Sequence, residues 1–110
     1  MADSAATARL RALLDGPRDG ALLRMSLANA LLADGNADEA LEQLRRALQF
    51  DADYSAAWKL LGRLLTERGD SAAAADAYRA GIAAAEQRGD KQALKEMQVF
   101  LRRLQKAASG

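Results

Sequence analysis

Apolar residues recur along residues 21–33 and 55–67 at intervals of three and four, which places them on one face of a helix. Gly35 and Gly69 follow these segments at the position expected just past a helix end. A polar residue suited to capping the next helix comes directly after each glycine. The pattern predicts two short helices, each followed by a tight turn. Their apolar positions are Leu23, Leu27, Ala30 and Leu31 in the first, and Ala57, Leu61, Leu64 and Leu65 in the second.

The same periodicity resumes after each turn. It predicts further helices over about residues 37–50 and 71–88, so that each turn joins two helices into a hairpin. The residues expected to be buried are Ala40, Leu41, Leu44 and Leu48 in one of these helices, and Ala74, Ala75, Tyr78 and Ile82 in the other.

An internal repeat supports this organisation. When the chain is shifted by 34 residues, Gly35 falls on Gly69 and Ala40 falls on Ala74, and large residues likewise fall on large ones. The reverse shift places Leu10 under Leu44, which makes the start of the chain half a repeat. The Gly16-Pro17 step after it cannot continue a helix and marks a loop. The predicted order is a half repeat at 5–15, a repeat at 21–54 and a repeat at 55–88.

The remaining segment, 90–107, reads as a capping helix. Asp90 is placed to cap it, and an apolar stripe runs along it at helical spacing. Glu96 stands where the repeat would require a small residue, so this helix does not follow the 34-residue pattern. We expect residues 1–110 to form a single all-α domain of about six helices. The stripe comprises Ala93, Leu94, Met97, Phe100, Leu101 and Leu104.

The second repeat has a characteristic set of residues at fixed positions: Trp58, Leu61, Gly62, Leu65, Ala74, Tyr78 and Gly81. With this set it resembles the tetratricopeptide repeat family, whose unit is a helix-turn-helix of 34 residues. The resemblance covers about residues 5–88. The second repeat departs from the family pattern at Glu86, where the family has Pro. The first repeat matches less well, with Arg24 at the Trp position and Ala52 at the Pro position. The resemblance implies antiparallel hairpins stacked in a short right-handed superhelix that binds other proteins.

The glycines inside helices suggest close packing, because glycine in a helix costs about 1 kcal/mol relative to alanine. We expect Gly62 to lie at the crossing of a helix pair with Ala74 opposite, and Gly81 to lie at a second close approach. Drift within a tolerant helix is the alternative interpretation. Trp58 is expected to fill core between hairpins.

Composition narrows the possible functions. Sixteen basic and fifteen acidic residues give a net charge of +1, so no overall field would attract nucleic acid or an anionic membrane. Cys and His are absent, which removes thiol nucleophiles, imidazole bases and most transition-metal sites. No phosphate-binding loop or specified carboxylate pair is present. We therefore expect no enzymatic activity, no cofactor, no metal and no small-molecule substrate. The lack of a leader or long apolar run predicts a cytoplasmic protein.

Family arrays are similar in receiving a partner segment on the concave surface of their first helices. The corresponding candidates here are Met25, Asn29, Lys59, Arg63, Thr66 and Glu67. Lys59 and Arg63 lie one turn apart and could jointly bind a carboxylate. Leu22, Met25 and Leu32 have a second interpretation, in which the half repeat or the final helix covers them.

One family mode grips the carboxylate end of a chaperone and can be compared position by position. That mode requires Lys, Asn, Asn, Lys and Arg at five positions. This chain has Met25, Asn29, Leu60, Asp90 and Leu94 at those positions, in the same order, so only Asn29 matches. The resemblance therefore does not extend to that partner.

Three hypotheses for function follow. The first is a protein-binding adaptor or scaffold that holds a protein or peptide segment on its concave face. The second is a structural protein that self-associates into a homo-oligomer through exposed array ends, which light scattering at two concentrations would detect. The third is nucleic-acid binding through the basic tail, which would be salt-dependent. The basic residues of the tail also fit a solvated helix face or an acidic-partner patch; they are Lys91, Lys95, Arg102, Arg103 and Lys106.

Overall fold

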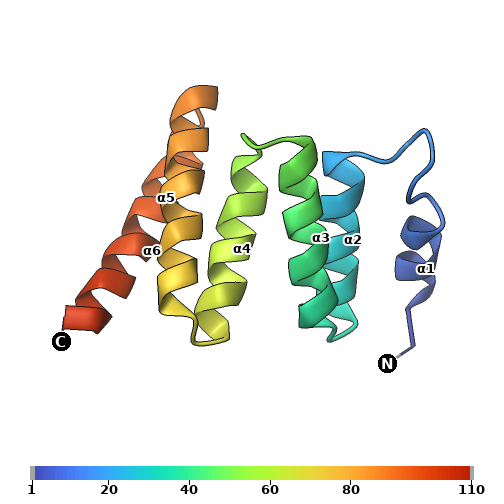
Figure 1. Cartoon of the computed structure of the whole chain (residues 1–110), viewed down its shortest axis with the longest axis horizontal. Helices are drawn as coiled ribbons and strands as arrows, with labels where there is room; N and C mark the ends of the chain where they lie inside the picture. The colour runs from blue at the N-terminus through green and yellow to red at the C-terminus, as the bar shows by residue number, and fades with distance from the viewer. Residues whose placement is uncertain (1, 110) are drawn as a thin grey trace. The chain divides into compact units, whose positions relative to one another are not determined.

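The computed structural model describes residues 2–109, which form six α-helices with no strand in this part of the chain (Figure 1). The prediction of an all-α fold of helix hairpins is confirmed. The chain divides into two compact units between Ala52 and Asp53: an N-terminal unit of three helices and a C-terminal unit of three helices. A single domain spanning both units remains a prediction of the repeat pattern. The helices are α1 (Ala5–Arg11), α2 (Ala21–Ala33), α3 (Ala37–Phe50), α4 (Ser55–Glu67), α5 (Ser71–Arg88) and α6 (Lys91–Ser109).

The two hairpins turn where the sequence predicts. Gly35 and Gly69 have φ angles of 80° and 81°, a left-handed conformation that side chains disfavour. The side chains of Asn36 and Asp70 then accept hydrogen bonds from the backbone N–H three residues later, at 3.3 and 3.2 Å. As a result α3 lies beside α2, and α5 lies beside α4 (Figure 1).

Helix α1 is shorter than the predicted half repeat at 5–15. It ends at Arg11, and residues 12–15 form turns in which Leu13 N–H bonds to Leu10 C=O at 3.1 Å. Asp15 has a φ of 63°, which a continuing right-handed helix cannot contain. The chain thus leaves the helix well before the Gly16-Pro17 step rather than at it.

A buried polar contact fixes α1 to α2. Thr7 is fully buried, and its hydroxyl donates to the Asp34 carboxylate at 2.6 Å. The Ser4 backbone N–H donates to the same oxygen at 3.0 Å. The core of this unit lies between α2 and α3, and its fully buried residues are Leu27, Ala28, Leu31, Ala40, Leu44 and Ala47.

The core of the C-terminal unit joins α5 to α6. Its buried cluster consists of Tyr78, Ala85, Ala93 and Met97. Trp58 is half-buried and packs against this cluster. The side chain predicted to fill core between hairpins therefore packs within its own unit, where α6 contributes to the surface that it contacts.

Both helical glycines lie at close approaches, as predicted. A Cβ added to Gly62 would lie 2.7 Å from Cδ1 of Tyr78, so the nearest neighbour of this glycine is the tyrosine ring rather than the expected Ala74. A Cβ added to Gly81 would lie 2.7 Å from Cβ of Trp58 and would overlap the sulfur of Met97. Gly81 thus allows α5 to approach both α4 and α6.

Gly81→Ala is expected to lower the free energy of unfolding, although alanine is the better helix former by about 1 kcal/mol. The added methyl overpacks the contact with Trp58 and Met97, at a cost of about 1–3 kcal/mol. Urea denaturation followed by circular dichroism measures the balance. Ala83→Gly, at an exposed site of the same helix, isolates the propensity effect. A gain in stability for Gly81→Ala contradicts the close approach.

The residues from 2 to 109 include no helix with both the length and the apolar character that a bilayer crossing requires.

Candidate functional site

The C-terminal unit contains an open groove of about 370 Å³. One wall is the end of α4, the other is the second half of α6, and α5 contributes to the floor. Three of the six predicted site residues lie on it: Arg63, Thr66 and Glu67. The complete lining is Arg63, Thr66, Glu67, Tyr78, Phe100, Arg103, Leu104 and Ala107.

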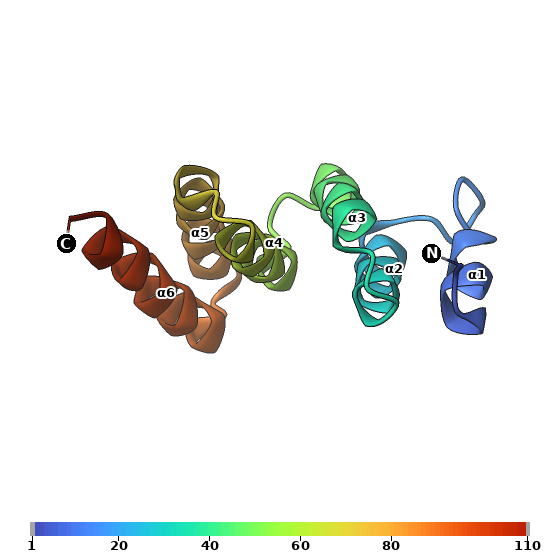
Figure 2. The same cartoon turned by 90° about the horizontal axis from the view of Figure 1, so that it is seen from below.

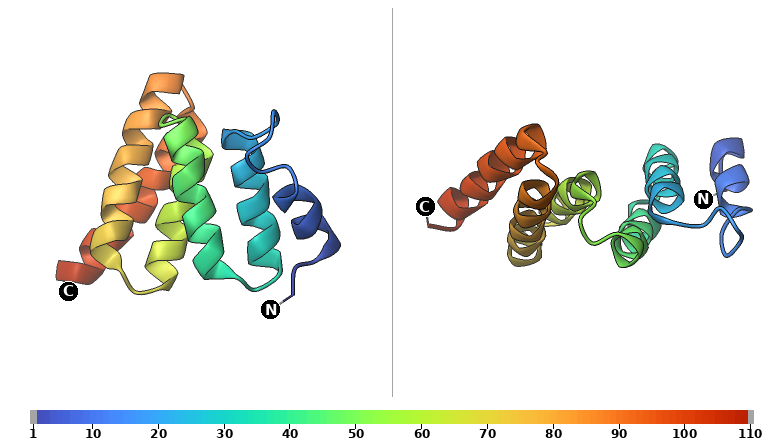
Figure 3. Two further views of the ribbon diagram at one scale, coloured as in Figure 1. Left: turned by 45° about the vertical axis from the view of Figure 1, so that its right-hand side comes forward. Right: turned by 90° about the horizontal axis from the view of Figure 1, so that it is seen from above.

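The groove exists because α6 is inclined to α4 and α5, as Figures 2 and 3 show. The buried residues of α6 are Ala93 and Met97, both in its first half. Farther along the same apolar stripe, Phe100 and Leu104 are only half-buried. The second half of α6 therefore presents part of its apolar face to the groove.

Two aromatic rings form the floor. Tyr78 and Phe100 have centroids 5.6 Å apart with planes tilted by 40°, a favourable arrangement for an aromatic pair. Tyr78 is 3% exposed, and this burial raises the pKa of its hydroxyl above the ordinary value. A side-chain hydrogen bond with Thr66 and the charge of Arg63 act in the opposite direction on that pKa. The floor is uncharged at neutral pH.

The rim of the groove carries charge. Arg63 Nε lies 3.5 Å from Glu67 Oε1, and both side chains are more than half exposed. An exposed pair of this kind contributes only about 0–1 kcal/mol, so Arg63 can exchange partners at little cost. On the opposite wall, Arg103 Cζ lies 5.9 Å from the centroid of the Phe100 ring. The rim therefore holds two guanidinium groups and one carboxylate.

Lys59 lies one turn before Arg63 on α4 and contacts α6. Its Nζ donates to Glu96 Oε2 at 3.1 Å, and each side chain is 36% exposed. Glu96, the residue that interrupts the repeat pattern, thus ties the last helix to α4. Both predicted carboxylate-binding cations already face a carboxylate of their own chain, so a joint site would require two ion pairs to open.

The other two predicted residues, Met25 and Asn29, lie on α2 in the N-terminal unit. Met25 is half-buried and Asn29 is exposed. Leu22, one turn before Met25, is 72% exposed, so the described residues leave it uncovered. A single surface that includes all six residues stays a prediction.

Sequence reasoning missed the wall that α6 supplies. The apolar stripe predicts that Phe100 and Leu104 lie on the buried face of a cap, and the basic pattern leaves Arg103 on a solvated face or in a patch for an acidic partner or nucleic acid. A signal was present in the length of the apolar stripe. The stripe continues to Phe100 and Leu104, past Met97, the last buried residue of α6.

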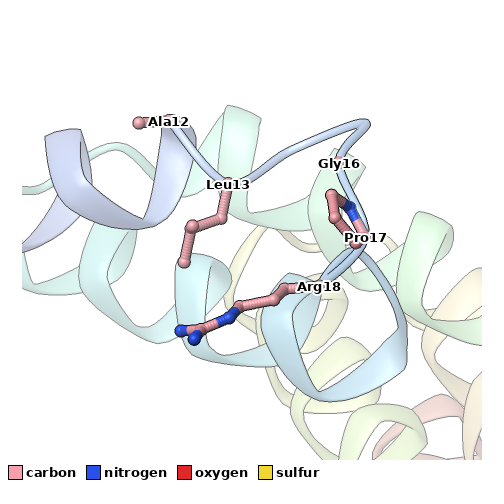
Figure 4. Close-up of a pocket in the computed structure, with 5 residues that line it drawn as sticks. All are labelled: Ala12, Leu13, Gly16, Pro17 and Arg18. Atoms are coloured by element: carbon pink, nitrogen blue, oxygen red, sulfur yellow. The ribbon is translucent and has the colours of Figure 1, made fainter.

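A second hollow, of about 190 Å³, lies in the loop between α1 and α2 (Figure 4). Leu13 and Arg18 point toward the same space beneath the loop, and Gly16 and Pro17 lie on the segment that returns toward Arg18. None of the predicted site residues lines it. Within residues 2–109, no group of three or more Asp, Glu, His or Cys side chains gathers in a way that could hold a metal ion.

Comparison with known proteins identifies the repeat. The family model described as tetratricopeptide repeat matches residues 3–55 and 25–89. The chain is similar to the TPR repeat-containing protein PA0015 of Pseudomonas aeruginosa. The two are 49% identical over 89 residues, which is 81% of this chain and 85% of that protein.

Solved structures show the same architecture. The solution structure of protein BPP2914 from Bordetella parapertussis has 48% identity and a TM-score of 0.78, over 94% of this chain and 90% of that one. A tetratricopeptide repeat domain protein from Salinibacter ruber has 29% identity and a TM-score of 0.74, over 82% and 90% of the two chains. The Sgt2 TPR domain from Aspergillus fumigatus has 25% identity and a TM-score of 0.66, over 99% and 85%.

Proposed function

Because the chain belongs to the tetratricopeptide repeat family, we propose that it is a protein-interaction module whose C-terminal groove holds a segment of a partner protein. The observation that carries this proposal is the half-covered apolar face of Phe100 and Leu104, which lies opposite Arg63 and Thr66 of α4. Apolar surface left open beside a polar rim is typical of a site that a partner covers.

The shape of the groove supports a short segment rather than a large folded surface. A volume of about 370 Å³ accommodates a few side chains. Aromatic and arginine side chains are the types that most often dominate the energy of a protein interface, and Phe100 and Arg103 stand side by side here. We expect a partner to anchor one bulky side chain on the floor and to make polar contacts at the rim.

Lys59, Met25 and Asn29 remain proposed contacts outside the groove. Lys59 would engage a partner only if its pair with Glu96 opens. Met25 and Asn29 would extend the contact to the N-terminal unit.

Site-specific crosslinking in cells of the native organism tests the proposal. A photoreactive amino acid at position 107, on the groove wall, is expected to crosslink to a discrete set of proteins, because Ala107 is exposed there. Adding Leu104→Glu replaces apolar surface of the groove with a charged side chain. It is expected to reduce that crosslinking at least about tenfold, because the bulky apolar side chain of a partner would then pack against a carboxylate.

Two controls accompany this experiment. The photoreactive residue at position 83, exposed on α5 outside the groove, should not give the same products. Circular dichroism checks that Leu104→Glu remains helical. A second blocking variant, Ala107→Arg, fills the groove from an exposed position without entering the core, and it is tested with the photoreactive residue moved to position 66 on the opposite wall. Identical products from positions 107 and 83, or products that both blocking variants leave unchanged, would contradict the proposed function.

A further inference from the structure

The charges around the groove are unbalanced. Arg63 and Arg103 lie on opposite walls, and Glu67 is the one carboxylate in the lining. That carboxylate lies beside Arg63 and partly neutralises its charge on the α4 wall. No carboxylate of the lining does the same for Arg103. A segment entering the groove meets an excess of positive charge.

The imbalance extends along α6. Residues 90–110 contain five basic and two acidic side chains. Both acidic residues act near the start of the helix: Asp90 accepts hydrogen bonds from Ser55 and from the Ala93 backbone, and Glu96 pairs with Lys59. In the described chain, Arg102, Arg103 and Lys106 have no carboxylate partner. With Val99 they line a hollow of about 240 Å³, and Arg103 also belongs to the lining of the groove.

Arg103 is available to recognise a carboxylate. Its Cζ lies over the Phe100 ring, 5.9 Å from the centroid, and its side chain is exposed. Arginine so placed binds a carboxylate through two parallel hydrogen bonds. The Phe100 ring itself, with Tyr78 and Leu104, offers apolar surface directly beside that cation.

We propose that the occupant of the groove is a partner-protein segment in which carboxylate side chains flank one bulky apolar side chain. The apolar residue packs on Tyr78, Phe100 and Leu104, and the carboxylates bind Arg103 and Arg63, the latter in exchange for Glu67. This inference rests on the proposed function and specifies the class of segment. The net charge of only +1 and the Glu67 carboxylate in the lining favour a protein segment over a nucleic acid.

Selection from a phage library of short random peptides against the purified full chain tests the proposal. The enriched peptides are expected to place Asp or Glu on both sides of Leu, Phe or Trp. A representative synthetic peptide should lose at least about tenfold in affinity, by fluorescence anisotropy, when its Glu residues become Gln. Arg63→Glu with Arg103→Glu should cause a similar loss, and a Lys-for-Glu peptide should bind this double variant better than it binds the wild type.

A charge-matched control changes Arg79→Glu and Lys95→Glu, which lie outside the groove lining and should leave affinity within about twofold, as expected for distant surface charges.

The acidic class would be overturned, and the proposed function left intact, by enriched peptides that are basic or neutral. Such peptides would bind the Arg63→Glu, Arg103→Glu variant as well as the wild type and would lose binding with Ala107→Arg. Peptides insensitive to Ala107→Arg, or no enrichment at all, would overturn both. A single-stranded DNA oligonucleotide that displaces the peptide and depends on the same arginines would overturn the assignment to a protein segment.

Discussion

Replacing Tyr78 by alanine is expected to lower the free energy of unfolding by about 3–5 kcal/mol, the range measured when a buried aromatic side chain is removed from a core. The ring is 3% exposed, contacts Phe100 and lies against the backbone of Gly62. Gly62 has no side chain that could move into the space, so the vacated volume would persist as a cavity. Losing the ring also removes part of the surface on which α6 rests.

Tyr78→Phe is the matched control, because it keeps the ring and removes only the hydroxyl. It should cost about 0.5–1.5 kcal/mol, the net value of one hydrogen bond, here the one with Thr66. Urea denaturation followed by circular dichroism measures both variants. Equal, small losses for the two substitutions would show that the ring does not occupy the core of the C-terminal unit.

The hairpins could be predicted from the sequence because local chemistry determines them. Gly35 and Gly69 supply the left-handed turns, and Asn36 and Asp70 cap the helices that follow. The end of α1 could not be predicted in the same way. Leu13 and Leu14 continue the apolar pattern, yet the helix ends at Arg11. The backbone N–H groups of Leu13 and Leu14 bond to the carbonyls three residues earlier, in turns, instead of four residues earlier as in an α-helix.

The candidate groove was only half predictable. Arg63, Thr66 and Glu67 follow from their register positions on α4, which the family resemblance supplies. The opposing wall depends on how a helix outside the repeat packs. The Glu96 to Lys59 ion pair and the contact between Gly81 and Met97 set that packing. Both contacts join residues that are far apart in the sequence, so the helical spacing and the repeat pattern do not predict them.

Arg24 departs from the family pattern, which has Trp at this position, and the sequence alone does not explain the departure. It occupies the position of Trp58 in the second repeat, and the structure buries it to 8% exposure. Its Nε and Nη2 donate to the two carboxylate oxygens of Asp19 at 2.9 and 2.6 Å, and its Nη1 donates to Gln43 at 3.0 Å. Its Cζ lies 5.9 Å from the centroid of the Phe50 ring. An ion pair thus replaces an aromatic side chain in the N-terminal unit.

Arg24→Met is expected to lower the free energy of unfolding by about 2–4 kcal/mol, because it leaves Asp19 and Gln43 without their partner in a buried site. Methionine preserves most of the side-chain length, so the loss reports the charge and hydrogen bonds rather than a cavity. Asp15→Asn is the control, since Asp15 approaches the same guanidinium at 3.6 Å but is 93% exposed, and it should have little effect.

The contribution of the same ion pair to the free energy of unfolding should be lost at acid pH. The hydrogen bonds from the Arg24 guanidinium, followed by one from the Asp15 backbone N–H, lower the pKa of Asp19 to about 2. A lowered carboxyl pKa stabilises the folded state above the ordinary value of about 3.9, and that contribution is lost as pH falls toward 2. Urea unfolding at pH 7 and between pH 5 and 2 should therefore show a steeper acid loss for the wild type than for Arg24→Met. Parallel acid profiles, together with additive losses for Arg24→Met and Asp19→Asn in a double-mutant cycle, would show that the two side chains do not stabilise the unit as a pair.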